Sequence, residues 1–289
     1  MKLVTFTHLG DTRIGVVADG EVADGRHAPV PQEMRELIAA GQPALQALKV
    51  LVDSKAHRIP LCAVQLRAPV RRPGKFLAIG LNYLEHIEET ELNPPKFPVF
   101  FNKQTTCVNG PYDCIHKPRI SDKLDYEGEL GFVIGRRCRH VPKERAPEVI
   151  AGYLIVNDVS VRDWQARSKT MTLGKSFDTH GPIGPWIVTP DEIGDPHTLD
   201  LKTWVNHELR QSANTREMIF NCFEQIEFLS TAFTLEPGDI ISTGTSSGVG
   251  VKMNPRGYLK PGDRVRVEIE RIGHIENPVI EEPDDTPVL

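Results

Sequence analysis

Short apolar segments, bounded by glycine, proline or polar residues, recur through most of the chain and have the length and composition of β-strands. They are KFLAIG (75–80), PVFFNK (98–103), LGFVIG (130–135), GYLIVNDVS (152–160), GPWIVT (184–189), DLKTWVN (200–206), GDIISTG (238–244) and DRVRVEIE (263–270). One long helix is predicted at 215–233, where apolar residues follow helical spacing. Strands outnumber helices and do not alternate regularly with them. The pattern therefore predicts an α+β protein, mostly β, with a mixed or rolled core.

The first 70 residues have a different pattern. Short strands broken by glycines occupy residues 1–24, and leucine and alanine at helical spacing predict two helices, around 32–40 and 43–53. The connector RAPVRRPGK (67–75) is rich in proline and arginine. We therefore predict a small N-terminal α+β domain at 1–70 and a larger domain at 71–289.

Composition argues against nucleic-acid-binding, membrane-spanning and disulfide-bonded proteins. The 289 residues include 39 acidic and 34 basic side chains, and this mild negative balance argues against a nucleic-acid partner. No apolar stretch approaches the roughly 18–20 residues that span a bilayer, and the N-terminal residues match neither a signal peptide nor an anchor. The five cysteines form no C-x-x-C pair, which favours reduced thiols. We expect a cytoplasmic protein with no membrane partner.

The segment KLDYEGELGFVIG (123–135) carries the first candidate site. Asp125, Glu127 and Glu129 are two residues apart, so in a strand they share one face. A solvated surface strand would explain them, but the apolar flanks indicate a strand inside the core. A further carboxylate, Asp158, ends the apolar segment YLIVND. Hard divalent cations prefer carboxylate oxygens, and a bound dication would convert the repulsion into attraction. Spacing leaves open whether Asp125 is a fourth ligand or a neighbour.

A second candidate lies in YLEHIEET (83–90). If this segment is helical, His86 and Glu89 are three apart and lie on one face. A carboxylate beside a histidine fixes its tautomer and raises its basicity, which suits the activation of water. An acidic helix end without catalytic function is the alternative. The adjoining proline-rich segment 92–98 is expected to be a loop or lid.

Two glycine-rich segments complete the candidates. Gly174-Lys175-Ser176 is not a phosphate-binding loop, because that motif needs glycine at 169, where Lys169 stands. Lys175 is therefore either a substrate contact or a surface lysine. The segment GTSSG (244–248) formally matches the nucleophile elbow of serine hydrolases, but the chain beyond it, VGVKMNPRG, is not a predicted helix. Its glycines instead favour a close approach of backbone N–H groups to an anionic ligand.

Five segments together resemble, in order, the motifs of the fumarylacetoacetate hydrolase family, over approximately residues 70–275. They are GLNYLEHIEE, DYEGELGFVIGRRCR, GYLIVNDVSVRDWQ, GKSFDTHGPIGPW and LEPGDIISTGTSSGVG. The resemblance implies a β-roll or sandwich core with few helices, a catalytic domain at 71–289 and a homodimer.

The resemblance also assigns roles to particular residues. The metal ligands fall on Glu127, Glu129 and Asp158, which the spacing alone could not separate from Asp125. The resemblance further implies catalytic roles for His86, Glu89 and Lys175, and substrate contacts for Arg162, Gln165 and Thr245. Ser246 stands where family members often have proline, which we expect to alter the stiffness of the loop more than its chemistry.

The implied activity is a metal-dependent hydrolysis of the C–C bond of a 2,4-dioxo acid. The substrate would be of the acylpyruvate type, such as fumarylpyruvate or a diketo-deoxy sugar acid, and the products pyruvate and a carboxylic acid. Mg²⁺ or Mn²⁺ is the expected cation, with Ca²⁺ also compatible. The family leaves two alternatives open, a decarboxylase of oxaloacetate-like acids and an isomerase of unsaturated dioxo acids. Two alternative functions lie outside the family: a serine esterase that uses Ser246, and a metal-stabilised binding protein without turnover.

Overall fold

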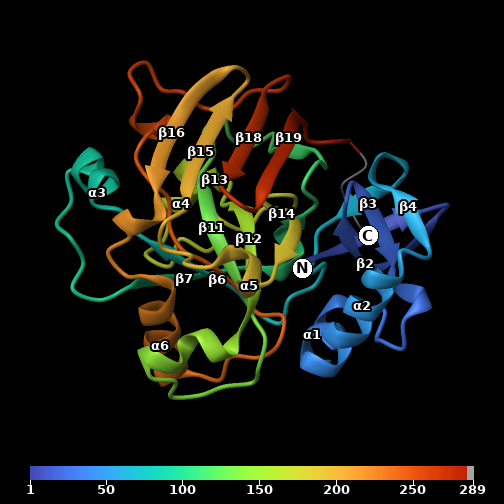
Figure 1. Cartoon of the computed structure of the whole chain (residues 1–289). Coiled ribbons are helices and arrows are strands. Elements are labelled where there is room, and N and C mark those ends of the chain that lie inside the picture. The colour runs from blue at the N-terminus through green and yellow to red at the C-terminus, as the bar shows by residue number, and fades with distance from the viewer. Residues whose placement is uncertain (285–289) are drawn as a thin grey trace.

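The computed structural model describes residues 1–284 and contains one large mixed sheet with a smaller sheet packed against it (Figure 1). The large sheet has the strand order β4-β3-β2-β1-β14-β12-β11-β17-β6-β7, and β5 and β8 pair with β1 and β14 outside this path. Its strands are β1 (Lys2–His8), β2 (Asp11–Ala18), β3 (Glu21–Asp24), β4 (Arg58–Pro60), β5 (Gln65–Arg67), β6 (Phe76–Gly80), β7 (Val99–Lys103), β8 (Val108–Asn109), β11 (Gly128–Ile134), β12 (Ile150–Asn157), β14 (Gly181–Val188) and β17 (Ile240–Ser242).

The smaller sheet has the order β16-β15-β18-β19-β9 and packs across β11, β12 and β14. Its strands are β9 (Ile115–Lys117), β15 (Asp200–Val205), β16 (Glu208–Asn214), β18 (Arg264–Ile269) and β19 (Gly273–Glu281). A two-stranded ladder joins β10 (Leu124–Asp125) to β13 (Ser160–Val161). Buried aliphatic and aromatic side chains, among them Leu130, Phe132 and Val267, fill the space between the sheets. The predicted α+β, mostly β fold is confirmed, and each strand predicted beyond residue 75 overlaps an observed strand.

The N-terminal strands extend the large sheet. β1 pairs antiparallel with β14, so that Lys2 lies opposite Val188. The helices of this region are α1 (Met34–Ala40) and α2 (Gln42–Ser54), close to the predicted ranges. Leu37 and Leu48 on these helices belong to the same buried cluster as Leu154 of β12. The last five residues of the predicted domain at 71–289 lie outside the described residues.

The prediction of a long helix at 215–233 is wrong at its N-terminal end, because α6 spans only Cys222–Ala232. The Asn221 side chain accepts hydrogen bonds from the N–H groups of Phe223 and Glu224, and the Glu224 side chain bonds back to the Asn221 N–H. This capping box begins the helix there. Before it, Thr215–Glu217 form a 3₁₀ turn, and Met218 makes a β-bridge with another segment. The other helices are α3 (Leu84–Thr90), α4 (Arg162–Gln165) and α5 (Pro190–Ile193).

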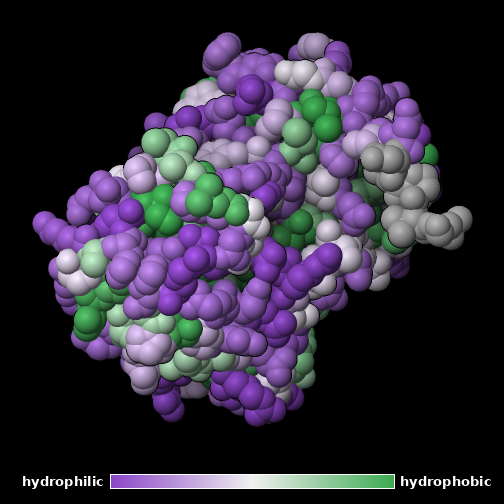
Figure 2. Space-filling model, turned by 90° about the vertical axis from the view of Figure 1, so that its right-hand side faces the viewer, coloured by the Kyte–Doolittle hydropathy of each residue, from purple (hydrophilic) through white to green (hydrophobic). Residues whose placement is uncertain are grey.

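The face that carries the N-terminal strands is mostly hydrophilic, and its hydrophobic residues form small separate groups (Figure 2). Scattered apolar residues of this kind are normal on protein surfaces. Within the part of the chain that the structure describes, no helix combines the length and the apolar character needed to cross a membrane.

Candidate active site

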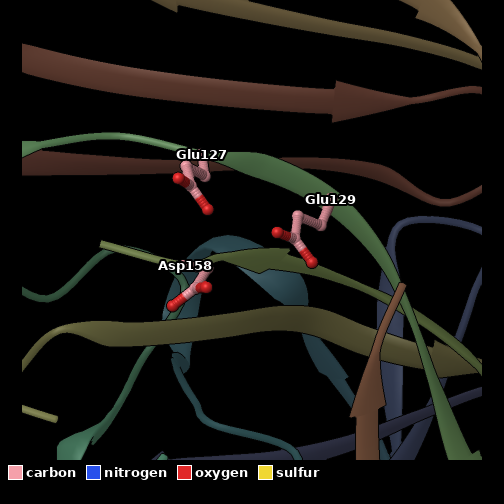
Figure 3. Close-up of side chains that lie close together, drawn as sticks. All are labelled: Glu127, Glu129 and Asp158. Carbon is pink, nitrogen blue, oxygen red and sulfur yellow. The ribbon is translucent and has the colours of Figure 1, made fainter. Parts of the chain in front are cut away.

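Three carboxylates converge in the large sheet where β11 and β12 lie side by side. Glu129 is on β11, Glu127 precedes that strand, and Asp158 directly follows β12. The N–H of Asp158 donates to the Glu127 carbonyl oxygen at 2.8 Å, which fixes the two strand ends together. Ligand oxygens of the three buried side chains lie within 4.8 Å of one another, and Figure 3 shows the side chains turned toward a common region. The structure thus brings together the three residues predicted as metal ligands.

Asp125 does not continue the same strand, and in this the predicted alternation is wrong. Asp125 ends β10 and pairs with Ser160 of β13, whereas β11 begins only at Gly128. Between the two strands, the N–H of Glu127 donates to the Asn157 side chain, which interrupts the ladder. Asp125 is buried but lies outside the group of three carboxylates. It is therefore a neighbour of the site, the second of the two alternatives that spacing left open.

Two buried lysines balance the negative charge. Lys175 Nζ donates to Glu127 Oε2 at 2.7 Å and to Asp158 Oδ2 at 2.8 Å. Lys103 Nζ donates to Asp158 Oδ1 at 2.6 Å and to the carbonyl oxygen of Lys175. Lys103 was missed by the sequence analysis. In PVFFNK it shares a strand face with the buried Phe101, and a lysine on the buried face of a strand was the signal that could have identified it.

The two residues predicted to contact the acid end of a substrate also meet. Arg162 begins α4, and its Nη1 donates to Gln165 Oε1 at 3.0 Å and to Glu127 Oε1 at 2.6 Å. Its Nε donates to Asp125 Oδ2 at 2.7 Å. Burial alone would lower the pKa of Arg162, but Asp125 and Glu127 outweigh it and raise that pKa. The guanidinium is therefore a permanent positive charge at the edge of the triad.

His86 and Glu89 form the predicted pair on α3, at the left edge of the molecule in Figure 1. His86 Nδ1 is 2.9 Å from Glu89 Oε2. We assign the ring proton to Nδ1 from this contact, which leaves Nε2 of the neutral ring as an acceptor. The other Glu89 oxygen accepts the N–H of Gly248 at 3.0 Å, and Ser247 Oγ donates to Glu85 at 3.2 Å. The helix that carries the pair is thus attached to the loop after β17.

Residues 243–251 form that loop, the post-β17 loop. Its backbone N–H groups donate to three different carboxylates: Gly244 to Glu129 at 2.8 Å, Gly248 to Glu89 at 3.0 Å, and Gly250 and Val251 to Asp125 at 2.8 and 2.9 Å. Gly248 has a φ of +97°, and a Cβ there would meet a backbone oxygen at 1.9 Å, so the position requires glycine. The sequence predicted that these N–H groups approach an anionic ligand. The anions in the structure are the protein's own carboxylates.

Thr245 and Ser246 lie in the same loop. Thr245 Oγ1 donates to the carbonyl oxygen of Gly128 at 3.0 Å and accepts from Gln211 Nε2 at 2.8 Å. Thr245 therefore anchors the backbone between two of the triad residues. Ser246 is buried, and the chain continues after it into the 3₁₀ turn Gly250–Lys252. A nucleophile elbow requires an α-helix at that point, so the local structure does not support the serine-esterase alternative.

The comparison with known protein families decides the classification. The model described as fumarylacetoacetate (FAA) hydrolase C-terminal matches residues 75–280. The chain belongs to the fumarylacetoacetate hydrolase family. The five motifs that carried the resemblance lie inside the matched range, so the prediction of the family is confirmed.

Relatives of this family member act in more than one way. The mitochondrial oxaloacetate tautomerase fahd2 of Xenopus laevis is 43% identical over 253 residues, which cover 87% of this chain and 79% of the relative. A fumarylacetoacetate hydrolase from Exiguobacterium antarcticum has a TM-score of 0.88 and 38% identity, and the match covers 98% of this chain and all of that one. A maleylpyruvate hydrolase from Sphingobium sp. SYK-6, solved with manganese(II) and pyruvate, has a TM-score of 0.83 and 34% identity at the same coverage.

The charge state of the triad in this family member fits a divalent cation. Burial alone would raise the pKa of Glu127, but Lys175 and Arg162 outweigh it and lower that pKa to about 2. Burial, followed by the charges of Asp158 and Glu127, raises the pKa of Glu129 well above its ordinary value. Glu129 is therefore the carboxylate that gains most from added positive charge. Three buried carboxylates are a donor set that hard dications prefer.

Replacing Glu129 with glutamine is expected to raise the melting temperature of the metal-free protein. The rise should be about 2–4 °C for each kcal/mol added to the free energy of unfolding. The change removes a buried charge repelled by Asp158 and Glu127, while the amide oxygen can still accept from Ser242 Oγ and Gly244 N, now 2.5 and 2.8 Å from Glu129 Oε2. The increase in the free energy of unfolding should reach its full size above the raised pKa of Glu129. It should vanish as the pH falls below the ordinary glutamate pKa, where the carboxyl is protonated in both the folded and the unfolded state.

Differential scanning calorimetry at neutral and acidic pH measures this effect. Added Mn²⁺ should raise the melting temperature of the unmodified protein and leave that of the variant unchanged. A variant that melts lower than the unmodified protein without metal, and is still stabilised by Mn²⁺, would contradict the assignment of Glu129 as a ligand.

Proposed function

We propose that this protein is a divalent-metal-dependent hydrolase that cleaves the C3–C4 bond of a 2,4-dioxo acid to give pyruvate and a carboxylic acid. One observation carries the proposal: the post-β17 loop holds both Glu129 of the triad and Glu89 of the His86 pair. A base suited to activating water is therefore attached to the same loop as the carboxylates suited to holding a cation and a 2-oxo acid. The presence of a maleylpyruvate hydrolase among the similar structures supports this choice.

His86 would act as the base. With Nδ1 bonded to Glu89, the free Nε2 can take a proton from the water that attacks the 4-carbonyl. Glu89 stabilises the imidazolium that forms, because its carboxylate faces the charged ring. The C3–C4 bond then breaks and its electron pair stays on C3 of the pyruvate half. The proton held by His86 is available for return to that carbon.

The remaining polar groups stabilise charge and orient the substrate. A divalent cation held by Glu127, Glu129 and Asp158 would accept the 1-carboxylate and 2-oxo oxygens of the substrate and stabilise the negative charge that develops there. Lys175, only 2% exposed and kept cationic by Glu127 and Asp158, adds a second positive charge beside the triad. We propose Mg²⁺ or Mn²⁺ as the working ion, with Ca²⁺ also compatible with an all-oxygen ligand set.

A second candidate is the keto–enol tautomerisation of oxaloacetate. The specific observation in its favour is the 43% identity to a protein named oxaloacetate tautomerase. The same residues would serve, since removing a proton from C3 of a 2-oxo acid and returning it to the oxygen requires a base and a stabilised enolate, but no attacking water. Decarboxylation of oxaloacetate-like acids also passes through the enolate of the product. Hydrolysis and tautomerisation thus differ in the bond that changes, and both require binding of the 2-oxo acid.

Activity on both substrate classes should disappear with EDTA and return with Mn²⁺ or Mg²⁺. The experiment incubates the protein with a series of acylpyruvates and with oxaloacetate, and measures pyruvate release, CO₂ release and the enol absorbance. Pyruvate from an acylpyruvate supports hydrolysis, and accelerated loss of the oxaloacetate enol without CO₂ supports tautomerisation. Activity indifferent to the chelator would contradict the metal dependence. Cation binding without any turnover would support the non-enzymatic alternative, and activity lost in Ser246→Ala but not with EDTA would favour an esterase.

We further propose that the protein works in the cytoplasm as a homodimer on a small 2-oxo or 2,4-dioxo acid. All five cysteines are free thiols in the structure, which suits a reducing compartment. Sedimentation of the purified protein measures the oligomeric state, and a monomer at micromolar concentration would contradict the dimer.

A further inference from the structure

Asp125 is a fully buried carboxylate beside the triad whose purpose the proposed mechanism leaves open. Its Oδ1 accepts the N–H groups of Tyr126 at 3.0 Å and Gly250 at 2.8 Å. Its Oδ2 accepts the N–H of Val251 at 2.9 Å and Arg162 Nε at 2.7 Å. Four donors, three of them on the backbone, therefore hold this carboxylate in one orientation. A carboxylate that is held so firmly can in turn fix the orientation of Arg162, its one side-chain partner among the described residues.

The guanidinium of Arg162 uses three of its five N–H bonds on protein acceptors. Nε binds Asp125, and Nη1 binds Glu127 Oε1 at 2.6 Å and Gln165 Oε1 at 3.0 Å. Nη2 is buried and has no hydrogen-bond partner among the described residues. A buried donor without a partner costs free energy, about 1–3 kcal/mol for a typical group, so Nη2 is available beside the triad to a ligand oxygen that would satisfy it.

The alternative orientation of Arg162 shows what Asp125 prevents. An arginine next to a carboxylate prefers to bind it with two parallel N–H bonds. Without Asp125, the guanidinium would be free to rotate and bind both oxygens of Glu127 through Nη1 and Nη2. That arrangement would turn Nη2 onto Glu127, so that Nη2 would no longer be available to the substrate.

We propose that Asp125 is a positioning residue that holds Arg162 by Nε and so presents Nη2 to the carboxylate of the 2-oxo acid. The inference rests on the proposed function, because the substrate class supplies the anionic oxygen. The approach of the post-β17 loop is part of the arrangement: a Cβ on Gly250 would meet Asp125 Oδ1 at 2.6 Å and the Gly257 carbonyl oxygen at 2.5 Å. Glycine at 250 therefore allows the backbone to come within hydrogen-bond distance of Asp125.

The test replaces Asp125 with asparagine in the full-length, Mn²⁺-loaded protein and measures the binding of pyruvate by calorimetry. The amide has the size of the carboxylate, but in either orientation its NH₂ group faces two of the four N–H donors, and its oxygen lacks the negative charge that holds the Arg162 guanidinium. Losing one charge-assisted hydrogen bond should weaken pyruvate binding by about 10–100-fold. The KM of the 2-oxo acid substrate should rise by a similar factor, with a smaller change in kcat. Unchanged pyruvate affinity in a folded variant would overturn the inference.

Asp239→Asn is the matched control. Asp239 is also fully buried, and it accepts the N–H groups of Lys75 at 2.9 Å and Glu236 at 2.8 Å and the Lys75 ammonium at 2.7 Å. Its replacement removes a comparable buried charge away from the triad, so it should lower the melting temperature without changing pyruvate affinity. Equal losses of pyruvate affinity in the two variants would show a general structural effect and contradict the positioning role.

Two further variants separate the possible outcomes. In an Arg162→Ala background, Asp125→Asn should cause no additional loss of pyruvate affinity, since Asp125 acts through Arg162; additive losses would overturn the inference. If Asp125→Asn does not fold, Arg162→Lys keeps the ion pair with Asp125 but lacks Nη2, and should show the same 10–100-fold loss. An unmodified protein that binds Mn²⁺ but no pyruvate would instead contradict the proposed substrate class and the inference with it.

Discussion

Replacing His86 with alanine is expected to lower kcat for the 2-oxo acid substrate by about 10²–10⁴-fold, the usual contribution of a general base. The side chain has no contact with the triad in the described hydrogen bonds, and its partner is Glu89. The affinity for Mn²⁺ should therefore stay the same. Steady-state kinetics at saturating Mn²⁺ and calorimetric titration of the cation measure the two quantities separately.

His197 provides a matched control for this variant. It also pairs with a carboxylate, Asp195, at 3.3 Å, and its ring packs edge-on against Phe223. Because His197 caps the N–H of Cys222 at the start of α6, its replacement should lower stability and leave kcat unchanged. Retention of kcat in His86→Ala would contradict the assignment of the base. A parallel loss of Mn²⁺ affinity would indicate that His86 supports the triad and does not act on water.

The second large effect is expected from Lys175→Met. The methionine fills a similar volume, but it removes the ammonium that bridges Glu127 and Asp158 in a site only 2% exposed. Removing one partner of a buried ion pair leaves uncompensated charge and typically costs about 3–5 kcal/mol. The free energy of unfolding, measured by urea denaturation without divalent cation, should fall by an amount of that order, and turnover should be lost.

Mn²⁺ distinguishes a charge effect from a packing effect in this variant. If charge is the cause, saturating Mn²⁺ should restore much of the stability, since the cation supplies positive charge to the same carboxylates, whereas turnover should stay low. Lys143→Met is the control: Lys143 pairs with Glu224 in a site that is 40% exposed, where screening by water makes ion pairs weak. A Lys143 variant as unstable as the Lys175 variant, or a Lys175 variant that Mn²⁺ does not rescue, would contradict this account.

Sequence reasoning reached the three carboxylates of the triad together with Asp125, and the resemblance to the family then separated Asp125 from them. Glu127 and Glu129 are separated by one residue, and Asp158 ends an apolar strand that pairs with the first one through Gly128 and Asn157. The spacing of the two glutamates and a carboxylate at the end of a second apolar segment were enough to make these residues candidates, whereas the pairing of the two strands was not predicted. The His86–Glu89 pair was accessible for the same reason, since three residues of helix bring both side chains to one face.

Features that depend on contacts between distant segments could not be predicted from the sequence. Lys103 reaches Asp158 from a strand 55 residues earlier in the chain, and nothing in the local sequence indicates that partner. The start of α6 was misplaced because apolar spacing continues through residues that bridge to Tyr83 instead of forming a helix. β16 and β19 were missed because ELRQSAN and GHIENPVIE lack a continuous apolar face, and both are held as strands by pairing with β15 and β18.

The post-β17 loop limits how this scaffold can change over evolutionary time. Four amides of one short segment hold Glu129, Glu89 and Asp125, so a substitution that moves the loop disturbs three roles at once. A substitution in this loop that suits a new substrate is therefore expected to disturb the positions of all three carboxylates. Segment 92–98 can vary more freely, because no described hydrogen bond joins it to these carboxylates. A mutant library for altered substrate range is best built in that segment, with residues 243–251 left unchanged.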